Sequence, residues 1–294
     1  MRVAVLCGPS IRAMYVANVL CARLPVALIV RETGHEWSWP ALRRALRPGA
    51  LRVRMRQALR AWRRRRRFNE RAFFFGARPA RFDAPHLVHE CSHINAASVA
   101  AAVRACGADA LAVFGTSLIR NPELLAIAPD RTLNLHGGIS PEYRGADSTF
   151  WALLAHDFTR IGCTIHRIDT CIDRGELIAY VHPRIGPGLR EEQLLSAAVR
   201  DAAPVFAEAF IRLAAGEPLG CPQPPGGRLF LVRDRRGRHD RELDEWYQRG
   251  NFPPVELPPR IVWHAAPAMT PAAMPVPTSS AADGRRLDPF RRIR

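Results

Sequence analysis

The sequence predicts an α/β fold with a doubly wound, mostly parallel, Rossmann-like sheet. Apart from Arg2, residues 2–7 are apolar, as in a buried strand, and a Gly-Pro-Ser turn follows at 8–10. Residues 11–23 carry apolar side chains at helical spacing, and residues 25–30 form a second apolar run. A strand, turn, helix and strand in this order are typical of a parallel sheet with crossover helices. The turn has a single glycine, so the G-x-G-x-x-G pattern of dinucleotide binding is absent.

Length and composition are those of a globular protein. The 294 residues are 48% hydrophobic and 24% charged, which suits one or two domains and excludes a fibrous or fully disordered chain. The apolar run at 25–30 is too short to cross a bilayer, and the N-terminal apolar stretch is shorter than that of a secretion signal. Seven cysteines without C-x-x-C spacing support neither a zinc site nor a disulfide framework. We therefore expect a cytoplasmic protein with reduced thiols and no stable membrane insertion.

The net charge of +16 is concentrated in one segment. All 43 basic residues are Arg, and 12 of them lie within residues 38–69, where there is no acid. The absence of Lys, together with abundant Ala and Pro, indicates a coding bias rather than a binding surface. Residues 38–75 are expected to form an Arg-rich helical insertion interrupted at Pro48-Gly49. A solvated insertion is the plainest interpretation, and contact with a phosphate-bearing ligand, RNA or an acidic membrane surface stays open.

The other predicted elements alternate along the chain. A helix is expected at 95–106, with Asn95 as its N-cap and Gly107 as its stop. The remaining expected elements are strands at 110–114, 133–136, 162–168 and 177–183, and helices at 121–128, 148–156 and 191–215. The first domain would close near residue 216. A small C-terminal extension over 217–250 would hold a strand at 227–232 and a helix at 238–248, and the Pro-rich residues 251–294 would be largely disordered.

Three polar side chains in the segment 133–177 suggest chemistry. Asn134 and His136 are two apart on a predicted strand, so both face the same side of the sheet, at the end where α/β folds bind ligands. An amide N–H can stabilise an oxyanion, and an imidazole can carry a proton near neutral pH. Asp173, on a later loop, can orient the histidine or accept a proton. Each residue alone is more often structural, but together they fit acyl transfer to an amine without a covalent enzyme intermediate.

The order and spacing of these residues resemble those of the N10-formyltetrahydrofolate-dependent formyltransferases. That family shows N-x-H, then a loop ending P-x-[YW]-R-G, and later a D-x-G segment. The corresponding segments here are Asn134-Leu135-His136, Pro141-Glu142-Tyr143-Arg144-Gly145 and Asp173-Arg174-Gly175. The resemblance covers roughly residues 1–215 and is densest over 107–180. It implies that residues 1–216 are a catalytic domain with the family's formyltransferase sheet.

The resemblance also implies roles, carried over position by position. Asn134 would hold the formyl oxygen, His136 would assist proton movement in the tetrahedral intermediate, and Asp173 would position His136 and help take the amine proton. The folate co-substrate would contact Thr116, Ser117, Leu118, Ile119, Asp169 and Ile172, the substrate loop would include Tyr143, Arg144 and Gly145, and no metal is expected. The family's P-S-L-L-P loop is Gly137-Gly138-Ile139-Ser140-Pro141 here, which leaves its contacts unassigned.

The amine acceptor stays open. Glycinamide ribonucleotide transformylases are compact and carry a Gly/Ser-rich phosphate loop that residues 8–12 do not match. Methionyl-tRNA formyltransferases carry a C-terminal barrel, for which the region after 216 is poor in strand patterns, although the Arg-rich stretch could bind tRNA in another way. Amino-sugar-nucleotide formyltransferases have small, variable C-terminal parts, so a small-molecule amine is favoured. A catalytically silent folate-binding module and a homodimer stay open as well.

Overall fold

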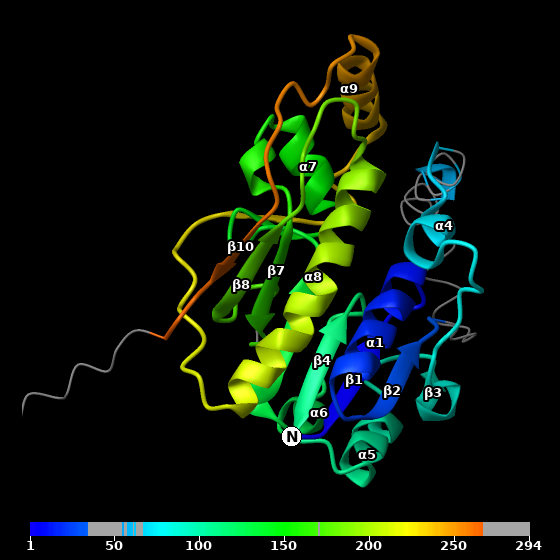
Figure 1. Ribbon diagram of the computed structural model, residues 1–294, viewed down its shortest axis with the longest axis vertical. Coiled ribbons are helices and arrows are strands. Elements are labelled where there is room, and N and C mark those ends of the chain that lie inside the picture. Colours follow the sequence, from blue (N-terminus) through cyan, green and yellow to red (C-terminus); the bar gives the residue numbers. More distant parts are fainter. Residues whose placement is uncertain (35–54, 56–57, 61, 63–66, 170, 267–294) are drawn as a thin grey trace, which may run out of the picture.

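An eight-stranded sheet forms the centre of the protein. The computed structural model describes residues 1–34, 55, 58–60, 62, 67–169 and 171–266. The strand order of the sheet is β10-β8-β7-β5-β4-β1-β2-β3 (Figure 1). The strands are β1 (Val3–Cys7), β2 (Val26–Glu32), β3 (Val88–Cys91), β4 (Ala110–Phe114), β5 (Thr132–His136), β7 (Cys163–Arg167), β8 (Leu177–His182) and β10 (Arg260–Trp263). The five strands from β3 to β5 pair in parallel, and β7, β8 and β10 continue the sheet antiparallel. Six of the eight strands therefore run in one direction, and the predicted fold class is confirmed.

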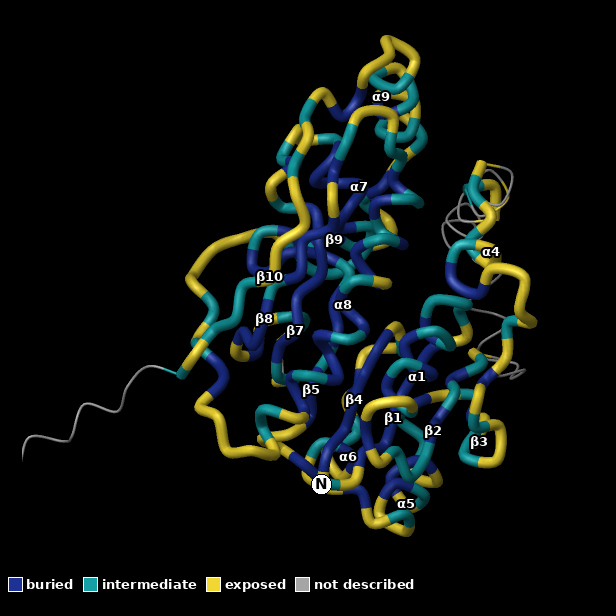
Figure 2. The backbone as a smooth tube through the Cα atoms, in the orientation of Figure 1, coloured by how far each residue is buried: buried dark blue, intermediate teal, exposed yellow. Residues whose placement is uncertain are grey.

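Helices cover both faces of the sheet, which buries its centre (Figure 2). The helices are α1 (Ile11–Arg23), α4 (Glu70–Phe75), α5 (Ala97–Ala105), α6 (Pro122–Leu125), α7 (Ser148–Leu154), α8 (Glu191–Ala214) and α9 (Gly237–Gln248). One face packs against α1, α4 and α8, and the other packs against α5 and α6. A third apolar cluster joins α7, α9 and Phe252 beyond the sheet. This two-sided cover explains why β1 and β4 are apolar at every position.

The opening of the chain folds as its pattern predicts. All five residues of β1 are buried, and β1 pairs in parallel with both β2 and β4. The hydroxyl oxygen of Ser10 accepts a hydrogen bond from the N–H of Ala13 (3.1 Å), which caps α1. The predicted turn is therefore the N-terminus of the first crossover helix.

The predicted N-cap at Asn95 is wrong. Helix α5 begins at Ala97, and its N-cap, Ala96, makes no side-chain hydrogen bond. The side-chain oxygen of Asn95 instead accepts the N–H groups of Arg120 (2.6 Å) and Asn121 (3.0 Å). Asn95 thus fastens the loop that follows β4. Asparagine suits both an N-cap and a loop anchor, because its short side-chain amide can hydrogen-bond to unpaired backbone groups in either place.

The Arg-rich insertion is described only in part. The predicted interruption at Pro48-Gly49 lies outside the described residues. The last part of the segment forms α4, whose Phe74 and Phe75 are buried beside Tyr15 on α1, with ring centroids 4.8 and 6.4 Å away. The expectation of a solvated insertion is therefore wrong for α4, because three aromatic rings anchor it to the core.

The expectation of disorder from residue 251 is wrong for 251–266. Strand β10 pairs antiparallel with β8, with Arg260 opposite His182, and Phe252 is buried among the aromatic residues of α9. Dense prolines hid a short β-branched and aromatic run at Ile261–Trp263. The predicted disorder of 267–294 lies outside the described residues.

β10 also places Arg260 opposite His182, a buried histidine with a shifted pKa. Burial lowers the pKa of His182 to about 4, and the nearby Arg260 acts in the same direction. The folded protein therefore favours the neutral ring, whereas an unfolded histidine takes a proton below about pH 6.5. Stability should fall between about pH 6.5 and 4 and then stop falling from this cause.

His182→Asn, which keeps a side-chain N–H to offer to the carbonyl of Ile161, should remove this loss. Urea unfolding midpoints at pH 7, 5.5 and 4 measure it, with the exposed His89→Asn as the matched control. An equal drop in wild type and His182→Asn would contradict the assignment.

Candidate active site

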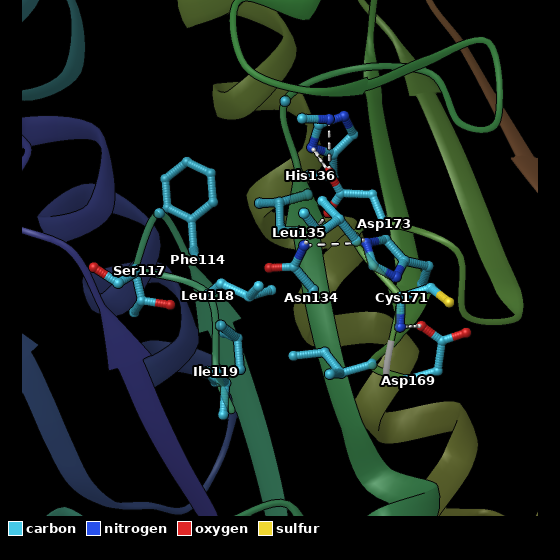
Figure 3. A pocket seen from close by; sticks show the side chains of 18 residues that line it. Phe114, Ser117, Leu118, Ile119, Asn134, Leu135, His136, Asp169, Cys171 and Asp173 are labelled. Atoms are coloured by element: carbon cyan, nitrogen blue, oxygen red, sulfur yellow. Dashed lines mark hydrogen bonds and ion pairs between the residues drawn. The ribbon is translucent and has the colours of Figure 1, made fainter. Parts of the chain in front are cut away.

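A cavity of about 340 Å³ opens at the carboxyl ends of β4 and β5. Three segments face one another across it: 113–119 at the end of β4 and beyond, 134–137 at the end of β5, and the loop after β7 (Figure 3). The residues predicted to contact folate all line it: Thr116, Ser117, Leu118, Ile119, Asp169 and Ile172. Parallel sheets commonly bind ligands at this end. The residues predicted to contact folate therefore surround a ligand-sized cavity. Their contacts with folate stay a prediction.

The structure brings together the three predicted catalytic residues. Asn134 and His136 project from β5 toward Asp173 on the loop after β7 (Figure 3). The Nδ1 of His136 lies 3.3 Å from Asp173 Oδ2, and the Nδ2 of Asn134 lies 3.4 Å from Asp173 Oδ1. One carboxylate thus contacts both β5 side chains. Their catalytic roles stay a prediction.

The second ring nitrogen of His136 is also enclosed. Its Nε2 lies 2.9 Å from the carbonyl oxygen of Tyr143 and 3.3 Å from the hydroxyl of Ser148. A proton on Nε2 can be donated to the carbonyl. When that proton leaves, the hydroxyl of Ser148 can turn and donate to the bare nitrogen. The surroundings therefore offer a partner to both protonation states of the ring.

Sequence reasoning missed His166, a second histidine in the cluster. Its Nδ1 lies 2.7 Å from the carbonyl oxygen of Arg167, which identifies Nδ1 as a donor. In the neutral ring, Nε2 accepts from the amide of Asn134 (3.0 Å). In the protonated ring, Nε2 can donate to Asp173 Oδ1, which lies 3.5 Å away. The signal was the antiparallel register of β5 and β7, which sets Asn134 opposite His166. That register cannot be read from the spacing along the chain alone.

Asp173 is the electrostatic centre of the site. Burial opposes its ionisation, but the contacts with His136 and His166 and the N–H of Gly145 (2.9 Å) outweigh burial and hold its pKa well below the usual range. Its backbone is left-handed, with φ of 50°, which is uncommon for a residue other than glycine. The loop therefore presents a permanent carboxylate to two imidazoles.

The predicted substrate loop contributes mainly backbone groups. Gly145 lines the cavity and gives its N–H to Asp173. The ring of Tyr143 stacks on Phe230, with centroids 5.9 Å apart, so this side chain lies in the apolar cluster. Arg144 donates to the carbonyl of Ile172 (3.3 Å) and thereby joins the substrate loop to the loop after β7.

The departure from the family's loop pattern has a steric reason. A Cβ on Gly138 would lie 2.6 Å from the hydroxyl of Ser148 and 2.7 Å from His136 Nε2. Ser148 therefore occupies the space that a side chain at position 138 would need. The hydroxyl beside His136 comes from α7 instead of from the loop.

Within the described part of the chain, no three His, Cys, Asp or Glu side chains are grouped as a metal ion would require. Over the same residues, no helix combines the length and apolarity needed to cross a membrane.

The fold and the site define an α/β protein with a polar cluster in a ligand-sized cavity at the ends of its parallel strands. Residues 70–210 match the family model described as formyl transferase. This segment, which holds the whole cluster, is therefore similar to the formyl transferase family.

Individual proteins similar to the chain share this family. A methionyl-tRNA formyltransferase of Anaeromyxobacter dehalogenans is 36% identical over 97 residues, which is 33% of this chain and 31% of that one. The enzyme of that name from Paraburkholderia xenovorans is 29% identical over 151 residues, 51% of this chain and 45% of that one. The matches thus span less than half the length of these relatives.

Solved structures agree on the fold. A sugar N-formyltransferase from a Shewanella species is 11% identical with a TM-score of 0.51, covering 83% of this chain and 86% of that one. A 4-N formyltransferase from Francisella tularensis is 10% identical with a TM-score of 0.51, covering 82% of this chain and 86% of that one. At this identity the likeness concerns the fold alone.

Proposed function

We propose that the protein transfers the formyl group of N10-formyltetrahydrofolate to a primary amine of a small molecule, of the amino-sugar-nucleotide class. The observation that carries this proposal is the contact of Asn134, His136 and His166 with one carboxylate, Asp173, at the wall of a cavity. Such a site offers an oxyanion donor and a proton carrier. It therefore suits direct attack by an amine, a one-carbon group transfer.

The first cavity suits the folate. Its walls combine apolar side chains, among them Leu118, Ile119 and Ile168, with the carboxylate of Asp169. A flat heteroaromatic ring with N–H donors needs this pairing of apolar faces and an acceptor, and the volume lies in the range of small-ligand sites. When bound there, the co-substrate would supply the formyl group beside Asn134.

Asn134, His136 and Asp173 would have separate roles in the transfer. The acceptor amine forms a bond to the formyl carbon, the bond from that carbon to N10 breaks, the amine loses one proton and N10 gains one. One amide hydrogen of Asn134 is given to His166, and the other makes only the longer contact with Asp173, so it can turn to the developing oxyanion. His136 would move the proton, and Asp173 would hold its ring.

A second cavity, of about 630 Å³, suits a small acceptor. It lies between the start of α1, the segment 68–71 and the start of α8. Leu195, which lines it, lies close to Gly137, which lines the first cavity, because a Cβ on Gly137 would be 3.2 Å from Leu195 Cδ1. An amine placed there would approach the formyl group from the side opposite the folate.

Transfer to a charged tRNA is the second candidate. The observation that favours it is the name of the curated relatives, which are methionyl-tRNA formyltransferases, together with the Arg-rich segment 38–69. The size of the second cavity, which lies in the range of small-ligand sites, favours the small acceptor. The two candidates share the first cavity and differ only in what enters the second.

An acceptor panel tests both. Purified protein and N10-formyltetrahydrofolate would be offered amino-sugar nucleotides, glycinamide ribonucleotide and charged initiator tRNA, and release of tetrahydrofolate would be followed. Release with an amino-sugar nucleotide, abolished in Asn134→Ala and His136→Ala, is the expected result. Release with charged tRNA alone would replace the acceptor class. Folate binding without release of tetrahydrofolate in the presence of any acceptor would support a catalytically silent folate-binding module instead.

A further inference from the structure

The C-terminal extension reaches back over the active site. Residues 219–230, called the clasp below, lie beyond the segment matched by the family model. Within the clasp, β9 (Arg228–Phe230) pairs in parallel with β6 (Tyr143–Gly145), the strand of the substrate loop. The fit before β9 is close, because a Cβ on Gly227 would lie 1.7 Å from the carbonyl oxygen of Pro141. One end of the clasp therefore fixes the loop that supplies Tyr143 O and the N–H of Gly145.

The other end of the clasp holds the loop that carries Asp173. The side-chain amide of Gln223 donates to two carbonyl oxygens, those of Asp173 (3.0 Å) and Gly175 (2.8 Å). Arg174, between them, donates to the carbonyl of Gly226 (3.0 Å). Three consecutive residues of the catalytic loop thus bond to the clasp.

This attachment bears on a residue whose backbone needs support. Asp173 has a left-handed φ of 50°, a conformation that costs energy unless its surroundings determine it. The carboxylate must reach His136 Nδ1 and His166 Nε2 at once, at 3.3 and 3.5 Å. A small rotation of the peptide at Asp173 would lengthen one contact or the other.

We propose that Gln223 is a positioning residue for Asp173, and that the clasp completes an active site which the family segment alone leaves unsupported. The proposal rests on the proposed function. Gln223 touches neither histidine; it fixes the carbonyl of Asp173 and so the direction of its carboxylate. Misplacement of a reacting group by about 1 Å can cost about a hundredfold in rate, so the loss of both hydrogen bonds should lower turnover.

The test uses the full-length chain with Gln223→Met, which keeps the side-chain length and removes both donors. Gln248→Met, at an exposed position of the same extension, is the matched control. Gln223→Glu would place a carboxylate against two carbonyl oxygens and should be at least as damaging. We expect kcat of Gln223→Met to fall by about tenfold to a hundredfold while the thermal unfolding midpoint stays near that of the control.

Two readouts separate positioning from a merely structural role. Asp173 owes its low pKa to His136, His166 and the N–H of Gly145, so a displaced carboxylate should have a higher pKa. Because the ionised form is the one that orients His136, the acid limb of the pH–kcat profile should move to higher pH in Gln223→Met. Amide hydrogen exchange over 171–175 should also quicken in Gln223→Met and not in Gln248→Met.

Each outcome bears on the proposal. Unchanged kcat and unchanged exchange in Gln223→Met would overturn it. A loss of activity that follows a general loss of stability, with no movement of the acid limb, would overturn it as well. If wild type releases no tetrahydrofolate with any acceptor while exchange over 171–175 quickens in Gln223→Met, the clasp is supported and the proposed function fails.

Discussion

Replacing Asp173 by Asn is expected to lower kcat by about a thousandfold, within the range seen when acid–base groups are lost. The carboxylate is the common partner of His136 and His166, and it accepts the N–H of Gly145. An amide keeps the shape but removes the charge that holds the imidazole of His136 for proton transfer. Tetrahydrofolate release with the acceptor found by the panel would measure the loss, with the exposed Asp130→Asn as control.

The same substitution should also change how the stability of the fold depends on pH. Because the folded protein lowers the pKa of Asp173, its carboxylate stabilises the fold fully above the unfolded value of about 3.9, and this contribution is lost as pH falls below it. Wild type should therefore be more stable than Asp173→Asn at pH 7, and the difference should shrink toward pH 3. A kcat of Asp173→Asn close to that of wild type would contradict the role assigned to Asp173. So would a stability difference between the two proteins that grows as the pH falls.

Replacing Arg235 by Met should lower the free energy of unfolding by about 3–5 kcal/mol, because it leaves a buried charge without its partner. Arg235 is 9% exposed and binds both carboxylate oxygens of Glu191, at 2.9 and 3.0 Å. It also contacts Asp240 at 2.8 Å and lies 3.6 Å over the ring centre of Phe150. Met preserves the packing on Phe150, so the loss would come from the charge. Urea unfolding would measure it.

The matched control for this effect is the exposed Arg233→Met, which should change stability little. The double variant Glu191→Gln with Arg235→Met removes both charges and should recover most of the loss. If the double variant is as unstable as the single one, the packing of Arg235, and not its charge, is what stabilises the junction of α8 and α9.

Local patterns predicted the first half of the fold and the centre of the site. The apolar runs of β1 and β2 are diagnostic because a parallel sheet covered on both faces has no polar side. Asn134 and His136 were readable because two residues apart on a strand share a face. Asp173 came from the family's order of motifs, since spacing along the chain does not show which loop reaches β5.

What the sequence concealed depends on contacts between distant segments. His166 joins the site through the register of β5 and β7, and Gln223 through two hydrogen bonds to backbone carbonyls. β10 is four residues long within Pro-rich surroundings, and it is fixed by pairing with β8. In each case the residue types are common ones, and their role follows only from their contacts in the folded chain.

The pairing of β10 with β8 has a consequence for the growing chain. Residues 1–216 contain β8, but the strand that covers its outer side comes only at 260–263. Until then, β8 presents a row of unpaired backbone groups, the feature through which sheets join edge to edge. A chain ending at residue 216 would keep that open edge for good. We therefore expect such a fragment to self-associate through the open edge of β8, which the pairing with β10 covers in the longer chain.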